Sequence, residues 1–209
     1  MNRLAHWTPR YVGARLQEMA YARLEPDKPW LTRQPNLALE SLLKPTDKGL
    51  EFGSGRSTVW FAQRLASLTS VEHDRDWHDQ VAKKIATSNI SNVTYVLRPA
   101  GVDESRLPAD PYVAIASTFA DASLDSVLVD GAQRGLCAEA SIPKIRSGGL
   151  LVVDNVNWYL PSASLAPNSR SLADGPRDDT WRRVDTAIRS WRRLWTTNHV
   201  SDTGIFFKP

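Results

Sequence analysis

Between residues 48 and 154 the chain alternates short apolar segments with stretches of helical periodicity, and this alternation limits the possible fold more than any other feature. Apolar segments lie at 49–52, 68–72, 93–97, 126–129 and 150–153. They are short, rich in β-branched residues and apolar at consecutive positions, as is typical of parallel strands buried on both faces. Strands that alternate with helices predict an α/β fold with a doubly wound, mostly parallel sheet.

The two ends of the chain extend this architecture. An amphipathic helix is predicted at 9–24 and a shorter one near 36–43, so residues 1–45 are interpreted as an N-terminal helical cap. Strands at 194–200 and 203–208 are expected to complete a seven-stranded sheet as an antiparallel hairpin. The turn of that hairpin is assigned to the sequence Asp202-Thr203-Gly204.

The sequence therefore predicts a single domain that spans residues 1–209. Its core is assigned to residues 48–156, and the Pro/Ser/Asn-rich segment 157–180 is interpreted as a loop on the substrate side.

Composition excludes several classes of protein. With 42% hydrophobic and 23% charged residues, the chain is typical of a globular protein and not of a disordered one. No apolar run approaches the ~18 residues of a membrane span, and the first residues lack the apolar stretch of a secretion signal. Cys137 is the single cysteine, which excludes an internal disulfide and a multi-cysteine zinc site. We therefore expect a cytoplasmic protein with no membrane partner.

Acidic residues stand at or near the carboxyl ends of four predicted strands. Glu51 lies near the end of the first strand, Glu72 ends the second, and Asp130 and Asp154 follow the fourth and fifth. Ligands of doubly wound sheets bind at the carboxyl ends of the strands. These four carboxylates are therefore the first candidates for a binding site.

The loop Gly53-Ser54-Gly55-Arg56-Ser57-Thr58 joins a strand to a helix and offers free backbone N–H groups to a ligand. A phosphate-binding loop would need a lysine after the second glycine, and the dinucleotide fingerprint would need a glycine where Thr58 stands. A carboxylate at Glu51 would repel a pyrophosphate and would favour a ligand with ammonium and sulfonium groups. S-adenosylmethionine is such a ligand.

The motif E-F-G-S-G-R-S-T, followed by V-E-H-D, resembles class I S-adenosylmethionine-dependent methyltransferases. This resemblance implies a Rossmann-like fold in which the glycine loop cradles the methionine part of the cofactor. It further implies that Glu72 accepts hydrogen bonds from the ribose and that His73 lies beside the adenine. The cofactor-binding residues that it implies are Glu51, Gly53, Ser54, Gly55, Ser57, Glu72, His73 and Asp130.

The segments V-L-V-D-G at 127–131 and G-G-L-L-V-V-D-N-V at 148–156 resemble the catechol, caffeoyl-coenzyme A and natural-product O-methyltransferase branch. That resemblance implies catalytic roles for Asp130 and Asp154, and a divalent cation such as Mg²⁺ held by Asp130, Asp154 and Asn155. The alternative is that the two aspartates contact the cofactor and cap their strands without a metal. The branch has a lysine three residues after the first aspartate, whereas this chain has Gln133 followed by Arg134.

Aromatic residues near these motifs are candidates for the substrate pocket. Trp158 and Tyr159 follow Asn155 and are predicted to stack on a flat or sugar-like acceptor, or else to pack the loop onto the sheet. Trp7, Tyr11 and Trp30 are candidates for a lid, and core packing of the N-terminal helix is the favoured alternative.

The favoured function is transfer of a methyl group from S-adenosylmethionine to a hydroxyl group of a small molecule. One alternative is an RNA or protein methyltransferase that uses the arginine-rich segment 181–195, where an apolar stripe of tryptophans with solvated arginines is the favoured interpretation. Another alternative is a cofactor-binding module without catalysis. The expected partner is a small-molecule acceptor and not a nucleic acid. Assembly as a homo-oligomer is one of the alternatives.

Overall fold

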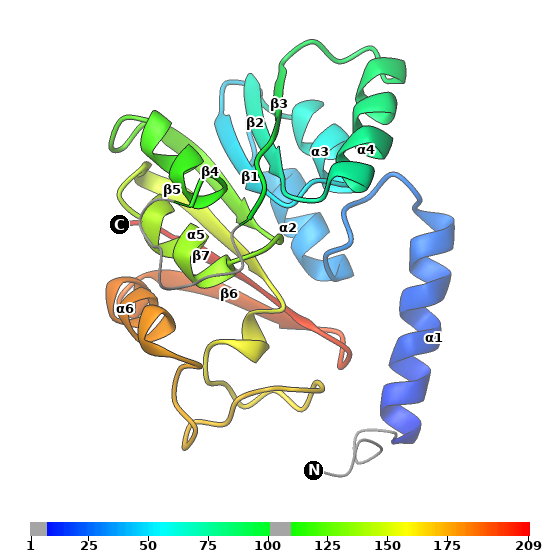
Figure 1. Ribbon diagram of the computed structural model, residues 1–209. Coiled ribbons are helices and arrows are strands. Elements are labelled where there is room, and N and C mark those ends of the chain that lie inside the picture. The colour runs from blue at the N-terminus through cyan, green and yellow to red at the C-terminus, as the bar shows by residue number, and fades with distance from the viewer. Residues whose placement is uncertain (1–7, 101–109) are drawn as a thin grey trace.

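The computed structural model of the protein describes residues 8–100 and 110–209, and within them the chain forms a seven-stranded sheet flanked by helices (Figure 1). The strands are β1 Lys48–Phe52, β2 Ser67–Glu72, β3 Val93–Leu97, β4 Leu124–Val129, β5 Ile145–Asp154, β6 Arg192–Thr197 and β7 Asp202–Phe207. The helices are α1 Pro9–Leu24, α2 Arg33–Leu42, α3 Arg56–Ala62, α4 Arg75–Thr87, α5 Arg134–Ser141 and α6 Asp179–Ile188. Short 3₁₀ turns, η2 Val113–Thr118 and η3 Val156–Trp158, precede β4 and follow β5. This is the Rossmann-like doubly wound fold that the sequence predicts.

The strand order is β3-β2-β1-β4-β5-β7-β6. The first five strands are parallel, and β7 pairs antiparallel with both β5 and β6. The chain leaves β1 towards one edge of the sheet and returns at β4 to build the other half. The strand order therefore reverses between β1 and β4, which is where a doubly wound sheet opens a crevice for ligands.

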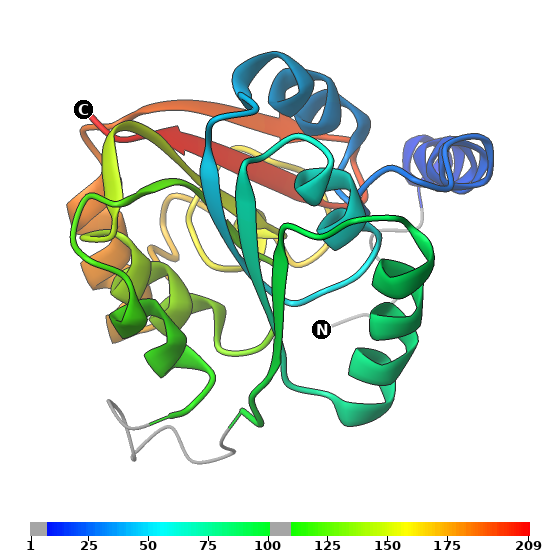
Figure 2. The ribbon, with the colours of Figure 1, turned by 90° about the horizontal axis from the view of Figure 1, so that it is seen from above.

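Both faces of the sheet are buried because its central strands are apolar at consecutive positions. In β5, Leu151 and Val153 join one hydrophobic cluster, whereas Leu150 and Val152 join the other. Helices α5 and α6 cover the first cluster through Cys137 and Trp181, among others, and α2 and α3 cover the second. Figure 2 shows these helix layers on opposite sides of the twisted sheet. Period-two alternation of strand side chains thus builds two cores from one sheet.

Helix starts follow local capping chemistry. The Asp74 carboxylate accepts a hydrogen bond from the Trp77 amide at the start of α4, and the Asp178 carboxylate does the same for the Trp181 amide in α6. Each cap satisfies a backbone amide of the first turn and so marks where its helix begins. Among the described residues, none of the helices is long and apolar enough to cross a membrane.

The predicted strands and helices all occur, and the differences lie at their ends. Helix α5 ends at Ser141, two residues before Pro143, whose nitrogen cannot donate a helical hydrogen bond. The next segment enters β5 at Ile145, before the predicted start. The predicted hairpin turn is wrong. Its turn residues lie at 198–201, where the Asn198 side chain accepts hydrogen bonds from two backbone amides. Residues 202–204 are instead part of β7, buried beside β5.

Helix α1 stands to one side of the sheet (Figure 1), which contradicts its predicted packing into the core. Ala14 is its single buried residue, and the Leu16 and Met19 side chains are 61% and 55% exposed. Side-chain hydrogen bonds hold the helix to the body, including one from Arg56 to the Ala22 carbonyl. Because few apolar groups are buried under α1, it forms one wall of an open space beside the sheet.

The carboxyl ends of β1 and β4 approach each other backbone to backbone at two glycines. Gly53 has a φ of +89°, and a Cβ atom built on it would lie 2.6 Å from the Gly131 backbone. A Cβ on Gly131 would lie 2.8 Å from the Gly53 nitrogen and would collide with the Tyr112 hydroxyl. Only residues without a side chain permit this approach, so the crevice between β1 and β4 depends on both glycines.

We predict that Gly131→Ala lowers the free energy of unfolding by about 1–3 kcal/mol, because the added methyl group overpacks the crossing of β1 and β4. Gly55→Ala is the matched control in the neighbouring glycine loop, since its Cβ would meet nothing closer than 3.9 Å. Urea unfolding of the two variants and of the unmodified protein measures the effect. Equal losses in both variants would contradict this account of the crossing.

Candidate functional site

A cavity of about 700 Å³ opens at the carboxyl ends of β1, β2 and β4. Seven of the eight predicted cofactor-binding residues line it, namely Gly53, Ser54, Gly55, Ser57, Glu72, His73 and Asp130. The sequence places these residues in three separate segments, and the parallel strand order brings the segments to one edge of the sheet. We call this space the first cavity.

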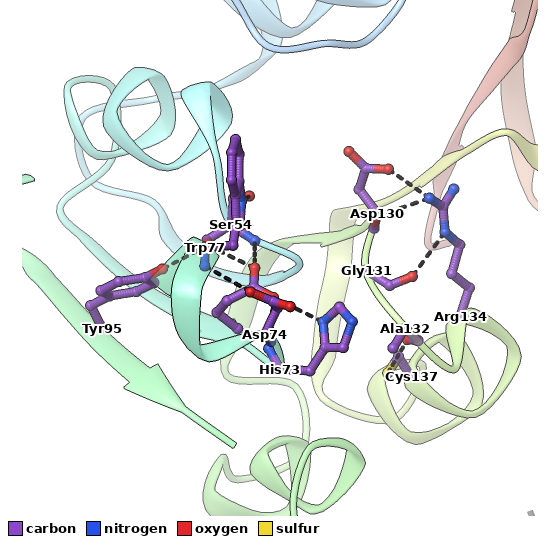
Figure 3. Close-up of polar contacts among 11 residues, drawn as sticks. Ser54, His73, Asp74, Trp77, Tyr95, Asp130, Gly131, Ala132, Arg134 and Cys137 are labelled. Carbon is purple, nitrogen blue, oxygen red and sulfur yellow. Dashed lines mark hydrogen bonds and ion pairs between the residues drawn. The ribbon is translucent and has the colours of Figure 1, made fainter. Parts of the chain in front are cut away.

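Glu72 is buried at the floor of the first cavity and accepts hydrogen bonds on both carboxylate oxygens. Its Oε2 accepts from the Ser54 amide at 3.0 Å and the Ser54 hydroxyl at 2.8 Å. Its Oε1 accepts from the amides of His73 and Asp74 and lies 2.8 Å from the His73 Nδ1 (Figure 3). Backbone amides therefore fix the carboxylate, whereas the hydroxyl and the imidazole belong to side chains that can rotate away for a ligand.

Glu51 lies outside the first cavity, which corrects its predicted contact with the cofactor. Its side chain is fully buried behind the glycine loop, where Oε2 accepts 2.6 Å hydrogen bonds from the hydroxyls of Thr58 and Ser70. Burial raises the pKa of Glu51 to about 7, against the lowering effect of these hydroxyls. Its position supports the loop from below and leaves ligand contact to other groups.

The structure adds Trp77 and Arg56, which the sequence analysis missed, to the first cavity and places the lid candidate Trp30 beside them. Trp77 donates from its indole nitrogen to the Ser54 carbonyl at 2.8 Å and stacks near Trp30, with ring centroids 6.5 Å apart. The Arg56 guanidinium lies over the Trp30 ring, 5.2 Å from its centroid. Arg56 belongs to the glycine loop, so its place in that motif was the one sequence signal that could have identified it as a cavity residue. Trp30 and Trp77 come from segments whose meeting depends on the tertiary fold.

A second cavity of about 510 Å³ lies beside the first, between α1 and the ends of β4 and β5. Asp154, Asn155 and Trp158 line it, together with residues of α1 and the segment that follows. Trp30, Arg56 and Asp130 line both cavities. These three residues therefore mark where a group in one cavity can meet a group in the other.

The aromatic candidates separate in the structure. Trp158 lines the second cavity, as its predicted role requires. Tyr159 faces the other way and stacks on Trp181, with ring centroids 4.6 Å apart and planes 15° apart, so it packs the loop onto the core. Of the predicted lid residues, Trp30 lines both cavities, Tyr11 lines neither, and Trp7 lies outside the described residues.

Asp130 and Asp154 form a pair of acids at the junction of the cavities. Burial, followed by the negative charge of Asp154, raises the pKa of Asp130 well above its ordinary value. Burial also raises the pKa of Asp154, although the Arg134 guanidinium and a 2.9 Å hydrogen bond from the Thr203 hydroxyl oppose that shift. The pair therefore holds a proton to a higher pH than exposed aspartates would.

The expected divalent cation does not fit these residues, because Arg134 lies among them. Its guanidinium contacts the carboxylate of Asp130 at 2.9 Å (Figure 3). It also donates to the amide oxygen of Asn155 at 3.0 Å and lies 3.9 Å from the Asp154 carboxylate. A dication 4 Å from this charge would be repelled by on the order of 8 kcal/mol at an effective dielectric constant of about 20. Within the described residues, no group of three or more His, Cys, Asp or Glu side chains is placed to hold a metal.

The arginines of α6 are largely neutralised by local acids. Arg183 pairs with Glu139 at 2.5 Å, Arg189 with Asp185 at 3.2 Å, and Arg182 with Asp179. On the opposite face of α6, Trp181, Val184 and Ile188 are buried, as the apolar stripe predicts. The helix therefore presents paired charges to solvent.

Comparisons with known proteins agree with this geometry. A family model described as a methyltransferase domain matches residues 50–156, more than half of the 209-residue chain. A solved structure from Corynebacterium glutamicum is 15% identical, covers 98% of this chain and 93% of its own, and has a TM-score of 0.59. A methyltransferase-like protein from Silicibacter pomeroyi is 22% identical over 88% of this chain and 90% of its own, with a TM-score of 0.56.

A third similar structure is a putative methyltransferase from Streptococcus mutans in complex with SAH. It is 10% identical over 86% of this chain and 99% of its own, with a TM-score of 0.54. The comparison with curated protein sequences gives no match. At these identities the solved structures show a shared fold, and the family model carries the assignment.

We predict that Glu51→Gln flattens the dependence of stability on pH. Because the folded chain keeps this proton up to a pH of about 7 whereas an unfolded chain releases it near 4.5, Glu51 makes stability fall as the pH rises between these values. The fall amounts to about 3 kcal/mol. Urea unfolding of both proteins at several pH values across this range isolates the contribution of Glu51. Parallel pH profiles would contradict the raised pKa.

Proposed function

The chain belongs to the methyltransferase family described by this model, and we propose that it transfers a methyl group from S-adenosylmethionine to a hydroxyl group of a small molecule. One observation carries the proposal. Two cavities, one lined by the glycine loop and Glu72 and the other by Asp154 and Trp158, meet at Asp130. Methyl transfer needs such a junction, because donor and acceptor must approach each other with their reacting atoms in line.

The first cavity has the features that S-adenosylmethionine requires. The contact between Gly53 and Gly131 leaves a cradle that a side chain would fill, so a ligand can lie close to the backbone. Glu72 offers a fixed carboxylate for the ribose hydroxyls once the Ser54 hydroxyl or the His73 ring turns aside. The Ser54 hydroxyl has another partner within reach, the Tyr95 hydroxyl at 2.7 Å. When bound, the cofactor supplies a methyl group on a positively charged sulfur.

The second cavity has the size and lining of a small-molecule site. Its volume of about 510 Å³ lies in the range usual for pockets that hold small organic ligands. Trp30 and Trp158 offer flat aromatic faces, on which a phenolic or sugar ring can stack. Arg15 and Lys28 on the wall already pair with Glu18 and Glu40, at 2.7 Å and 2.6 Å. These features favour a compact polar acceptor with one flat face.

Asp130 is the group that we assign to the proton of the acceptor. It lines both cavities, and its side chain keeps 26% exposure at their junction. Its raised pKa makes the Asp130 carboxylate a stronger base than an exposed aspartate, and the charge of Asp154 contributes to that shift. Asp130 would accept the hydroxyl proton while the acceptor oxygen bonds to the methyl carbon, the bond from that carbon to sulfur breaks, and the electron pair stays on the sulfur of the leaving thioether. Asp154 acts through Asp130 as a positioning residue.

Calorimetric titration with S-adenosylhomocysteine, with NAD as the comparison ligand, tests the cofactor site. We expect binding of S-adenosylhomocysteine alone, and a loss of about tenfold or more in affinity for Glu72→Ala, because the ribose hydroxyls lose their acceptor. Asp154→Asn is the matched control, since Asp154 lines the second cavity and not the first. Binding of NAD without S-adenosylhomocysteine would contradict the proposal.

Turnover tests the acceptor site. On a hydroxylated acceptor found by screening phenols, sugars and natural products, Asp154→Asn is expected to lower kcat by about tenfold or more, because the Asp130 carboxylate becomes a weaker base. The affinity of the variant for S-adenosylhomocysteine should stay within about twofold of the unmodified value. Full activity of Asp154→Asn would remove this residue from the mechanism.

A further inference from the structure

The Arg134 guanidinium makes four hydrogen bonds to oxygen atoms and an ion pair with the Asp130 carboxylate. The Nε donates to the Gly131 carbonyl at 3.1 Å. The Nη1 donates to the Asp154 carbonyl at 2.6 Å and to the Asn155 amide oxygen at 3.0 Å. The Nη2 donates to the Asp130 carbonyl and contacts the Asp130 carboxylate, both at 2.9 Å. A guanidinium has five N–H groups, so these contacts engage nearly all of its donors within the protein.

These acceptors surround the guanidinium as a cage of oxygen atoms. Three backbone carbonyls, one carboxylate and one amide oxygen converge on the guanidinium, and the Asp154 carboxylate lies 3.9 Å away. Hard divalent cations select such all-oxygen sets. The Arg134 side chain is only 13% exposed, so the positive charge is held inside the cage and away from solvent.

Backbone geometry aims Arg134 into the cage. Gln133 adopts the left-handed conformation, with a φ of 45°, and its side chain donates to the Asp110 carboxylate at 2.6 Å. Arg134 is then the first residue of α5, and its side chain folds back over the ends of β4 and β5. Asn155 is also left-handed, with a φ of 50°, and its amide oxygen meets the same guanidinium. Both strand ends therefore turn towards one cation.

We propose that Arg134 is a built-in substitute for a divalent cation, so that this protein positions Asp130 and Asp154 without metal. The guanidinium ties the carboxyl ends of β4 and β5 together and blocks metal entry by occupying the oxygen donors. Compared with a dication, it leaves the junction of the cavities one unit of charge more negative, which favours a positively charged methyl donor. The proposed methyl transfer then needs no metal, but the proposal about cation binding stands or falls separately from it.

The test is to remove the guanidinium and measure Mn²⁺ binding directly. The electron paramagnetic resonance signal of free Mn²⁺ reports binding without any activity assay. We expect Arg134→Ala to bind one Mn²⁺ per chain at least about tenfold more tightly than the unmodified protein does. Arg134→Ala should also unfold at a lower temperature than the unmodified protein and regain part of that loss when Mn²⁺ is added. The double variant Arg134→Ala with Asp154→Asn should lose the Mn²⁺ site.

Arg146→Ala is the matched control. Arg146 pairs with Asp125 at 2.5 Å and joins the same two strands near their opposite ends, without a convergent oxygen cage. It should gain no Mn²⁺ site. Binding of one Mn²⁺ by the unmodified protein, lost in Asp154→Asn, would overturn the proposal, as would a folded Arg134→Ala that binds no more than the unmodified protein. If Arg134→Ala does not fold, Arg134→Gln replaces it and is judged by the same criteria. The Mn²⁺ measurement on the unmodified protein tests the proposal without either variant.

Discussion

The close approach of Gly53 and Gly131 is the constraint on which the rest of the site depends. The two residues follow β1 and β4, which are neighbours in the sheet although more than seventy residues separate them in the chain. Because neither has a side chain, the two strand ends can meet backbone to backbone and open a crevice beside them. The glycine loop then turns over Glu72, and Asp130 reaches the point where the two cavities join.

This arrangement brings four acidic residues to the ends of neighbouring strands, and each has a different electrostatic environment. Glu51 is buried with hydroxyl partners and supports the loop, whereas Glu72 is held by backbone amides at the cavity floor. Asp130 and Asp154 are close enough to affect each other's ionisation, and one guanidinium faces them both. Carboxylates at four strand ends therefore differ in burial and partners, and the different roles that we propose for them rest on these differences.

Much of the fold could be predicted from the sequence because strand and helix periodicities are local properties. The strands from β1 to β5 and the acids at their ends follow from apolar segments that alternate with helices. The errors came from contacts between distant segments. For α1 core packing was favoured, but the helix stands to one side. For Tyr159 the sequence left pocket lining and loop packing open, and the structure stacks it on Trp181. A local pattern marks a side chain as apolar or aromatic but does not say which surface it will meet.

The sequence by itself determined the order of the elements, the glycine loop and the set of acids, since each depends on the neighbours of a residue along the chain. The tertiary structure decided what fills the space between those acids. In the sequence, Arg134 is the residue beside the position where the resemblance has a lysine, and Asp130, Asp154 and Asn155 have the character of metal ligands. Only the left-handed turn at Gln133 and the pairing of β4 with β5 bring the guanidinium within hydrogen-bonding distance of both strand ends. A side chain as long as that of arginine reaches any of several partners, and the surrounding fold selects among them.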